Sequence, residues 1–141
     1  MAYSHGKFVW FEHVSDDVPG ARRFYDTLFG WNSDGVDIGG NTYHMIMNGA
    51  DGIGGYRQAM PGVPSHWMSY LSVSDVDATA ARAQAAGARL LMPPTEFGPV
   101  GRAATLADPA GGVFSIWKRA PKATDRMRHK SPPATGHGTN S

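Results

Sequence analysis

The chain has 141 residues, 41% of them hydrophobic and 18% charged, which is enough to bury the core of one globular domain. It contains no cysteine, so disulfides, thiolate metal sites and cysteine nucleophiles are excluded. The net charge of +1 divides into +5 from Lys118 onward and −4 before it, and this mildly acidic body argues against a nucleic-acid partner. The N-terminus has no apolar run long enough for a signal peptide or membrane span, so we expect a cytoplasmic protein with no membrane partner.

The first half of the chain predicts a strand, a helix and three further strands. Residues 7–14 are rich in aromatic and β-branched side chains, which favours a strand. The polar run 15–17 can cap a helix whose apolar side chains recur at helical spacing, and Gly30 is well placed to end that helix. Shorter strands are expected at 31–38, 42–48 and 53–58.

The second half of the chain repeats this order. We expect a strand at 66–73, a helix at 76–86, a short strand at 89–92, a loop at 93–100, and strands at 101–107 and 113–118. The tripeptide Val14-Ser15-Asp16 recurs 59 residues later as Val73-Ser74-Asp75, and the pair Gly54-Gly55 recurs 57 residues later as Gly111-Gly112. The repeat predicts two tandem βαβββ modules, residues 7–58 and 66–119, in an α+β fold.

The repeat also predicts how the two modules assemble. Each module should be a curled sheet with a helix on its outer face, and neither sheet can cover its own inner face. The two sheets should therefore pair into an open cup. We expect one domain over residues 1–120, followed by a flexible, basic tail over residues 121–141.

Several motifs are similar to those of the vicinal oxygen chelate superfamily, which includes glyoxalase I, bleomycin-resistance proteins and extradiol dioxygenases. They are the two V-S-D helix starts, the run FYDTLFGW at 24–31 and the run ADPAGGVF at 107–114. The resemblance covers residues 7–119 and implies the glyoxalase/bleomycin resistance/dihydroxybiphenyl dioxygenase fold in its single-chain, two-module form. It also implies a divalent metal in the cup, held by His and Glu side chains from four strands.

This chain holds other residue types where the resemblance implies metal ligands. The first position, seven residues before the aspartate that starts the helix, is Val9. The other three positions hold Met68, Ser115 and either His44 or Met45. Valine has no donor atom, and methionine and serine are poor ligands for the metals concerned. We therefore expect no cofactor, with a divalent metal bound elsewhere in the cup as the alternative.

Alternation along a strand assigns side chains to the two faces of the sheet. In the first strand, the residues expected to face the cup are Val9, Phe11 and His13. The residues expected to face the helix are Phe8, Trp10 and Glu12, unless a bulge reverses the register. The cup-facing residues of the second module should be His66, Met68, Tyr70, Ser115 and Trp117.

His13 and Glu12 are the candidate catalytic residues. An imidazole with a pKa near neutral can act as a general base or a ligand. A carboxylate within an aromatic strand either forms an ion pair with an arginine or, facing the cup, has a raised pKa and can act as a base. Arg57 and Arg102 are the expected anchors for an anionic ligand. The residues expected to line the ligand site are Phe11, His44, Met45, Met47, Arg57, His66, Met68, Tyr70, Arg102, Ser115 and Trp117.

Two functions follow as hypotheses. The first is the binding of a small apolar or aromatic molecule in the cup without the usual metal, because pockets of this kind are mostly apolar with a few placed polar groups. The alternative is a glyoxalase-like or dioxygenase-like enzyme, a lyase, isomerase or cyclase. It would use acid–base chemistry of His13 or Glu12, or a relocated metal held by His13, His44 or His66. We also expect a homodimer, since the resemblance implies pairing across an exposed sheet edge.

Overall fold

The computed structural model describes residues 5–38 and 40–121. In chain order the elements are β1 (Phe8–Ser15), α1 (Val18–Phe29), β2 (Asn32–Ile38), β3 (Asn41–Asn48), β4 (Asp51–Gln58), β5 (His66–Ser72), α2 (Val76–Ala85), β6 (Arg89–Phe97), β7 (Gly101–Ala107) and β8 (Val113–Arg119). The predicted flexible tail lies outside the described residues, apart from Pro121. Neither helix in the described ranges is both long and apolar enough to span a bilayer.

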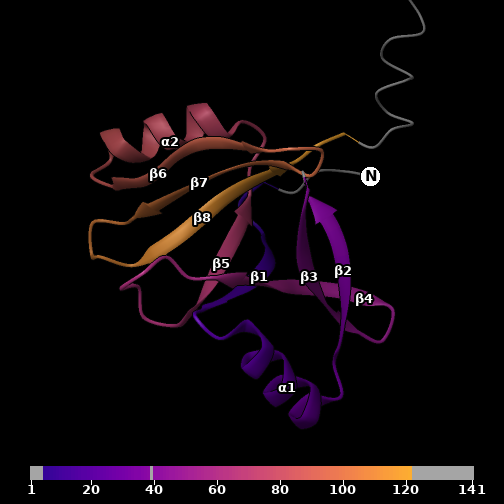
Figure 1. The fold of residues 1–141 in the computed structure, drawn as a ribbon. Coiled ribbons are helices and arrows are strands. Elements are labelled where there is room, and N and C mark those ends of the chain that lie inside the picture. The colour runs from indigo at the N-terminus through magenta and orange to yellow at the C-terminus, as the bar shows by residue number, and fades with distance from the viewer. Residues whose placement is uncertain (1–4, 39, 122–141) are drawn as a thin grey trace, which may run out of the picture.

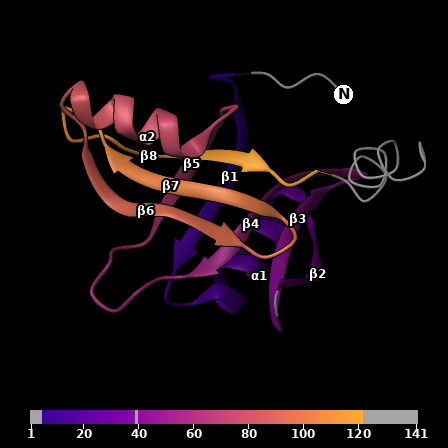
Figure 2. The same cartoon turned by 90° about the horizontal axis from the view of Figure 1, so that it is seen from above.

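The eight strands form one curled, mixed sheet in the order β2-β3-β4-β1-β5-β8-β7-β6 (Figure 1). Within each module the first strand pairs in parallel with the last, β1 with β4 and β5 with β8. The modules join where β1 and β5 pair antiparallel at the middle of the sheet. Seen from above, the strands of both modules bend around a common concave side (Figure 2). The predicted pair of βαβββ modules and the curled sheet are thus confirmed, and we call the concave face, opposite the helices, the cup.

The two helices begin with the same cap. The side chain of Asp17 accepts a hydrogen bond from the backbone N–H of Gly20, and that of Asp75 accepts one from Ala78. The two caps are 58 residues apart, so aligning the modules on Asp16 was wrong by one residue. At the other end, α1 stops at Gly30, whose φ of 69° suits only a residue without a Cβ atom.

Two strands have a boundary that differs from the prediction by more than one residue. β6 continues through Pro93 and Pro94, where a loop was expected, because it is an edge strand in which a missing N–H can point away from its neighbour. Register shifts on either side of Met92 absorb the irregularity. β4 begins at Asp51, two residues before the predicted start, because its pairing with β3 extends to the end of that strand.

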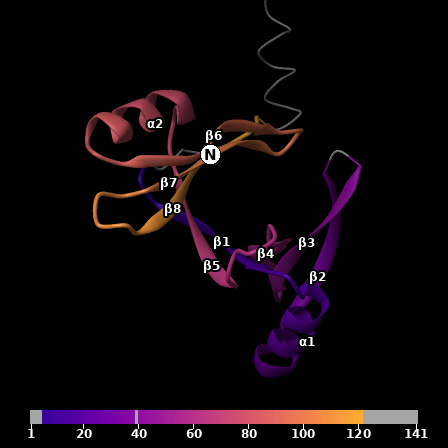
Figure 3. The same cartoon turned by 60° about the vertical axis from the view of Figure 1, so that its left-hand side comes forward.

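The two helices pack very differently. α2 lies on the outer face of β6, β7 and β8, over a core of Val73, Val76, Ala80, Ala104, Leu106 and Ile116. α1 contacts β1 and β4, buries none of its residues and projects away from the sheet of its module (Figure 3). At the shift of 58 residues, Tyr25 and Leu28 of α1 correspond to Ala83 and Ala86 in the second module. Small side chains let α2 approach its sheet, whereas large ones hold α1 further out.

Candidate functional site

A buried carboxylate occupies the middle of the cup. Glu12, on β1, is 5% exposed and accepts hydrogen bonds from three side chains on three other strands. The hydroxyl of Tyr43 donates to Oε2 over 2.8 Å, and the hydroxyl of Tyr70 donates to Oε1 over 2.7 Å. Nε of Arg57 also donates to Oε1, over 2.8 Å, which makes the contact an ion pair. We call these four residues the Glu12 cluster.

The Glu12 cluster connects to other cup residues of both modules. The indole N–H of Trp10 donates to the hydroxyl of Tyr43 over 3.2 Å. On the other side, Tyr70 interacts with Ser115, whose hydroxyl lies 2.7 Å from that of Thr105. The rings of Tyr70 and Trp117 meet edge to face with centroids 6.3 Å apart. The cup therefore holds a polar network bordered by aromatic rings.

The electrostatics of the cluster keep its donors protonated. Burial, followed by the negative charge of Glu12, raises the pKa of Tyr43 and of Tyr70 well above the usual value. Burial alone would lower the pKa of Arg57, but the charge and the hydrogen bond of Glu12 raise it. Both hydroxyls thus remain donors and Arg57 remains a cation near neutral pH. The cluster can hold a carboxylate without an uncompensated buried charge.

From Trp10 onward, the first strand presents the opposite faces from those predicted, whereas Phe8 lies on the outer face as expected. Glu12 and Trp10 face the cup, whereas the ring of His13 packs against Tyr25 of α1 and Trp67, at centroid distances of 5.4 and 4.9 Å. The alignment on Asp16 had set the faces of β1 one residue out of step, and β1 also has a register shift between Phe8 and Trp10. Because of this bulge, Phe8 and Phe11 stack on the same face despite their odd spacing, with centroids 6.4 Å apart. The expected cup-facing set of Val9, Phe11 and His13 was therefore wrong.

The positions implied for metal ligands also move. Counting seven residues back from Asp17, which caps α1, gives Trp10 in place of Val9. The fourth position lies on β4, not β3, because β4 is the counterpart of β8: Tyr70 pairs with Ser115, and its equivalent Glu12 pairs with Gly55. A Cβ atom at Gly55 would collide with the ring of Tyr43.

The four positions thus hold Trp10, Gly55, Met68 and Ser115, a set of residues that does not fit a divalent metal. Within residues 5–38 and 40–121, no three His, Asp or Glu side chains gather in a way that could hold a metal ion. Glu12 and His13 also lie on opposite faces of β1, so these two side chains cannot share one metal ion.

Most of the other predicted lining residues are on the cup side. Met68 packs with Tyr70 in a small buried cluster, and Met45 and Met47 alternate onto the same face as Tyr43. Their neighbour His44 therefore faces outward, in contrast to the prediction, and its pKa is lowered by burial and by Arg22. Nδ1 of His66 lies 2.8 Å from the carbonyl of Pro64, at the start of β5.

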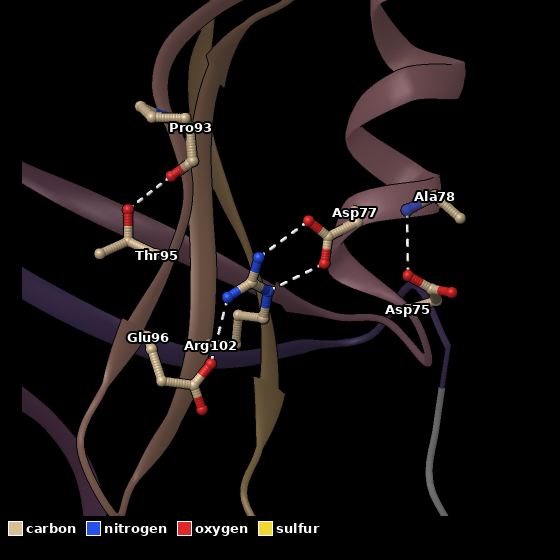
Figure 4. Close-up of polar contacts among 7 residues, drawn as sticks. All are labelled: Asp75, Asp77, Ala78, Pro93, Thr95, Glu96 and Arg102. Carbon is tan, nitrogen blue, oxygen red and sulfur yellow. Dashed lines mark hydrogen bonds and ion pairs between the residues drawn. The ribbon is translucent and has the colours of Figure 1, made fainter.

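Arg102 is not a ligand anchor in the cup. Its guanidinium donates two hydrogen bonds of 2.9 Å to the carboxylate of Asp77 and one of 3.1 Å to Glu96 (Figure 4). These contacts raise its pKa and tie the first turn of α2 to β6 and β7. Arg102 therefore has a structural role on the outer surface, since its donors are already directed at two carboxylates.

Two cup residues, Trp10 and Tyr43, were missed by the sequence prediction. A buried carboxylate needs hydrogen-bond donors on neighbouring strands, so placing Glu12 in the cup would have required such a search. Tyr43 alternates with Met45 and Met47, which were predicted to line the cup, and this alternation was the available signal.

His13 should make the protein less stable in mild acid. Burial, followed by the charge of His66, lowers the pKa of His13 in the folded state below its ordinary value of 6.5. The unfolded chain therefore takes up the proton first, and stability should fall as the pH drops from about 7 through 6.5. Urea unfolding between about pH 8 and pH 5 should show a shallower loss for His13→Gln than for wild type. Replacing exposed His5 by glutamine should leave the pH dependence of the unfolding free energy as in wild type. The same pH dependence in wild type and both variants would contradict the prediction.

Comparison with known proteins identifies the family of the chain. A family model described as Glyoxalase-like domain matches residues 10–117. The Mycobacterium tuberculosis protein named glyoxylase CFP32 is 40% identical over 119 residues, covering 83% of this chain and 46% of that protein. The anthracycline biosynthesis protein DnrV of Streptomyces peucetius is 30% identical over 133 residues, covering 83% of this chain and 48% of the relative. The chain thus spans about half the length of either relative.

Solved structures share the fold at low sequence identity. Methylmalonyl-CoA epimerase from Mycobacterium tuberculosis has a TM-score of 0.61 at 16% identity, covering 88% of this chain and 95% of the other. The Mn(II)-bound glyoxalase from Novosphingobium aromaticivorans has a TM-score of 0.58 at 21% identity, covering 86% of this chain and 42% of the other. The sequence match over most of the chain, together with the curled two-module sheet, shows that the protein belongs to the glyoxalase-like domain family of the vicinal oxygen chelate superfamily.

Proposed function

We propose that this protein binds a small, planar aromatic molecule in its cup, without the divalent metal of its superfamily. The observation that carries the proposal is the Glu12 cluster, which fills the centre of the cup between positions where metal ligands are replaced by Trp10, Gly55, Met68 and Ser115. The carboxylate is already held by two hydroxyls and one guanidinium, so it needs no metal to compensate its charge. The protein would act by enclosing the ligand.

Arg57 offers the polar contact that a ligand could use. Its side chain is 43% exposed, and Nε is its one hydrogen-bonding atom among the described residues. The terminal nitrogens can therefore donate to a carboxylate, phenolate or carbonyl oxygen. Trp10, Trp117 and Met45 offer aromatic and thioether surface for a flat ring. This combination favours an aromatic ligand that carries an oxygen anion or a polarised carbonyl.

Binding of matched probes tests the proposal. Tryptophan fluorescence and calorimetry should detect 1-naphthoate with a Kd of about 100 µM or tighter, and the neutral 1-naphthalenemethanol at least about tenfold more weakly. Arg57→Met should abolish this preference for the anion, while Arg102→Met should preserve it. Trp117→Ala, which replaces none of the four residues of the Glu12 cluster, should weaken both probes. Equal binding of both probes by wild type, or binding of neither, would contradict the proposal.

The metal-free part of the proposal has its own measurement. Elemental analysis of protein purified without chelator should find no stoichiometric metal, because the four implied positions hold no suitable set of donors. Stoichiometric Fe, Mn, Ni or Zn would overturn this part, whatever the result with the aromatic probes.

The alternative function, an enzyme, is favoured by one feature of the same site. Glu12 is a buried carboxylate bonded to two hydroxyls, which could pass a proton to or from a bound substrate. The version based on His13 has less support, because that ring lies on the other face of β1. Methylmalonyl-CoA, the ligand of a related epimerase structure, is a suitable probe in D2O. The measured reaction is the exchange of deuterium into the carbon between the two carbonyl groups of this probe. Exchange that continues in the presence of EDTA and is lost in Glu12→Gln would favour the enzyme over the binding protein.

A further inference from the structure

A continuous aromatic surface runs from α1 to β1 on the outer face of the first module. Successive ring centroids are 5.0 Å apart for Phe24 and Tyr25, 6.3 Å for Tyr25 and Phe29, 5.1 Å for Phe29 and Trp31, and 6.5 Å for Trp31 and Trp67. Trp67 and Phe11 line the same hollow, and Phe11 stacks on Phe8. We call these seven residues the aromatic belt.

The aromatic belt is widely exposed. Phe8, Phe24 and Phe29 are 57%, 58% and 56% exposed. Phe11 and Trp67 are 45% and 42% exposed, and Leu28 beside them is 56% exposed. At ~200 Å² for a fully exposed ring, this surface presents roughly 600 Å² of apolar area, which is at the upper end for a monomer. Two copies facing each other would bury about 1,200 Å², the lower limit for a specific and stable protein interface.

In the second module, the outer face of the sheet is covered by its helix. There, α2 lies on its sheet and covers a buried core, whereas α1 buries none of its residues and leaves the rings beside it open. A hydrogen bond of 3.3 Å, from the indole of Trp67 to the hydroxyl of Tyr25, links α1 to β5. The outer face of the first module therefore lacks the cover that its counterpart has.

The belt carries both projections and hollows. A hollow of about 300 Å³ is lined by Phe11, Trp31, Ile46, Ile53, Gly54 and Trp67. A shallow, open depression lies on the surface of α1, lined by Arg23, Phe24, Thr27 and Leu28. Because the rings of α1 project beside these hollows, a twofold axis can place the projections of each copy in the hollows of the other.

We propose that a second copy of this chain covers the aromatic belt, forming a twofold homodimer with α1 at its centre. The area reaches the lower limit for two copies, and the surface carries both exposed rings and a hollow lined by Phe11, Trp31 and Trp67. The longer relatives also carry, within one chain, about as many residues again as this chain has. A second copy supplies a comparable mass without a covalent link. The interface differs from the sheet-edge pairing expected from the resemblance, since it uses the outer face of the sheet and α1.

Solution mass with paired surface variants tests the interface. Sedimentation velocity from about 1 to about 100 µM should give twice the chain mass of 15.1 kDa for wild type. The double variant Phe24→Asp/Leu28→Asp should dissociate at least about tenfold more readily, because it buries charges in an apolar interface. Leu91→Asp is the matched control, as Leu91 is 45% exposed on β6, far from the belt. A monomeric wild type, or a dimer that the double variant leaves intact, would overturn the proposal.

Cross-linking distinguishes this interface from any other between two copies. The chain has no cysteine, so a single introduced thiol reports one site. Thr27→Cys, at the depression on α1, should form a disulfide-linked dimer under mild oxidation, whereas Ala85→Cys on exposed α2 should not. A dimer that cross-links through Ala85→Cys and not through Thr27→Cys would place the interface elsewhere and contradict the proposal. Neither variant touches the Glu12 cluster, so the result is independent of ligand binding.

Discussion

Replacing Glu12 by alanine should lower the free energy of unfolding by about 3 kcal/mol, because it leaves Arg57 and two tyrosine hydroxyls without their shared acceptor. Removing one partner of a fully buried pair costs roughly 3–5 kcal/mol, and the partial exposure of Arg57 places this pair at the low end of that range. Urea unfolding followed by circular dichroism measures the change directly, as a lower midpoint at an unchanged slope.

Two controls separate the cluster from a general effect of losing a carboxylate. Glu12→Gln keeps the shape and one acceptor oxygen, so it should lose less stability than Glu12→Ala. Glu96→Ala removes an exposed partner of Arg102 and should have little effect, since exposed ion pairs contribute little. If Glu12→Ala were as stable as wild type, the four residues would not form the connected unit that their distances indicate.

The second large effect is expected from Gly54→Ala. A Cβ atom at Gly54 would collide with the backbone carbonyl oxygen of Phe11, its partner in the parallel pairing of β1 and β4. A backbone atom cannot rotate away, so the strands must separate and strain the pairing on which the Glu12 cluster depends. We expect a loss of about 3 kcal/mol, at the upper end for an added methyl group in a packed site.

Gly52, two residues before Gly54 on β4, provides the comparison for this prediction. At Gly52 an added Cβ would lie 3.2 Å from the sulfur of Met45, which belongs to a flexible side chain that can move. Gly52→Ala should therefore change stability by less than about 1 kcal/mol, and alanine's smaller unfolded-state entropy can make it neutral. Similar urea midpoints for the two variants would show that the carbonyl of Phe11 yields more easily than this packing implies.

The fold was predictable from sequence because it depends on a repeat. Helix caps, turn glycines and hydrophobic alternation occur twice along the chain, so each module supports the assignment of the other. The prediction ended β6 at Met92, because the two prolines that follow are ordinarily signs of a loop and only the edge position of this strand tolerates them. The outward position of α1 was equally hidden, since its apolar stripe is the usual sign of a packed helix.

The site was harder to predict because it depends on single-residue register. The adjacent Asp16 and Asp17 offer two helix starts, and choosing the wrong one moves the implied ligand position from Trp10 to Val9. Alternation from Val9 then assigns His13 to the cup and Glu12 to the outer side, whereas alternation from Trp10 gives the observed faces. The bulge after Phe8 adds a second irregularity, which leaves Phe8 on the outer face with Phe11. Arg57 lies on the cup side within β4, where it binds Glu12, and its role as a ligand anchor stays a prediction. Nothing in the sequence indicated the two carboxylates that bind Arg102 on the outer surface.

The parallel pairing of the first and last strand in each module has a consequence for the order of folding. The antiparallel ladders β2-β3-β4 and β6-β7-β8 join neighbouring segments, so they can form on the microsecond scale of hairpins. Parallel contacts such as Phe11 with Gly54 and Tyr70 with Ser115 instead close a loop around a helix, and must wait for a long stretch of chain to be brought together. The barrier to folding of each module should therefore lie at the step in which its first and last strands pair in parallel. The pairing of β1 with β5, which joins the two modules, should form last.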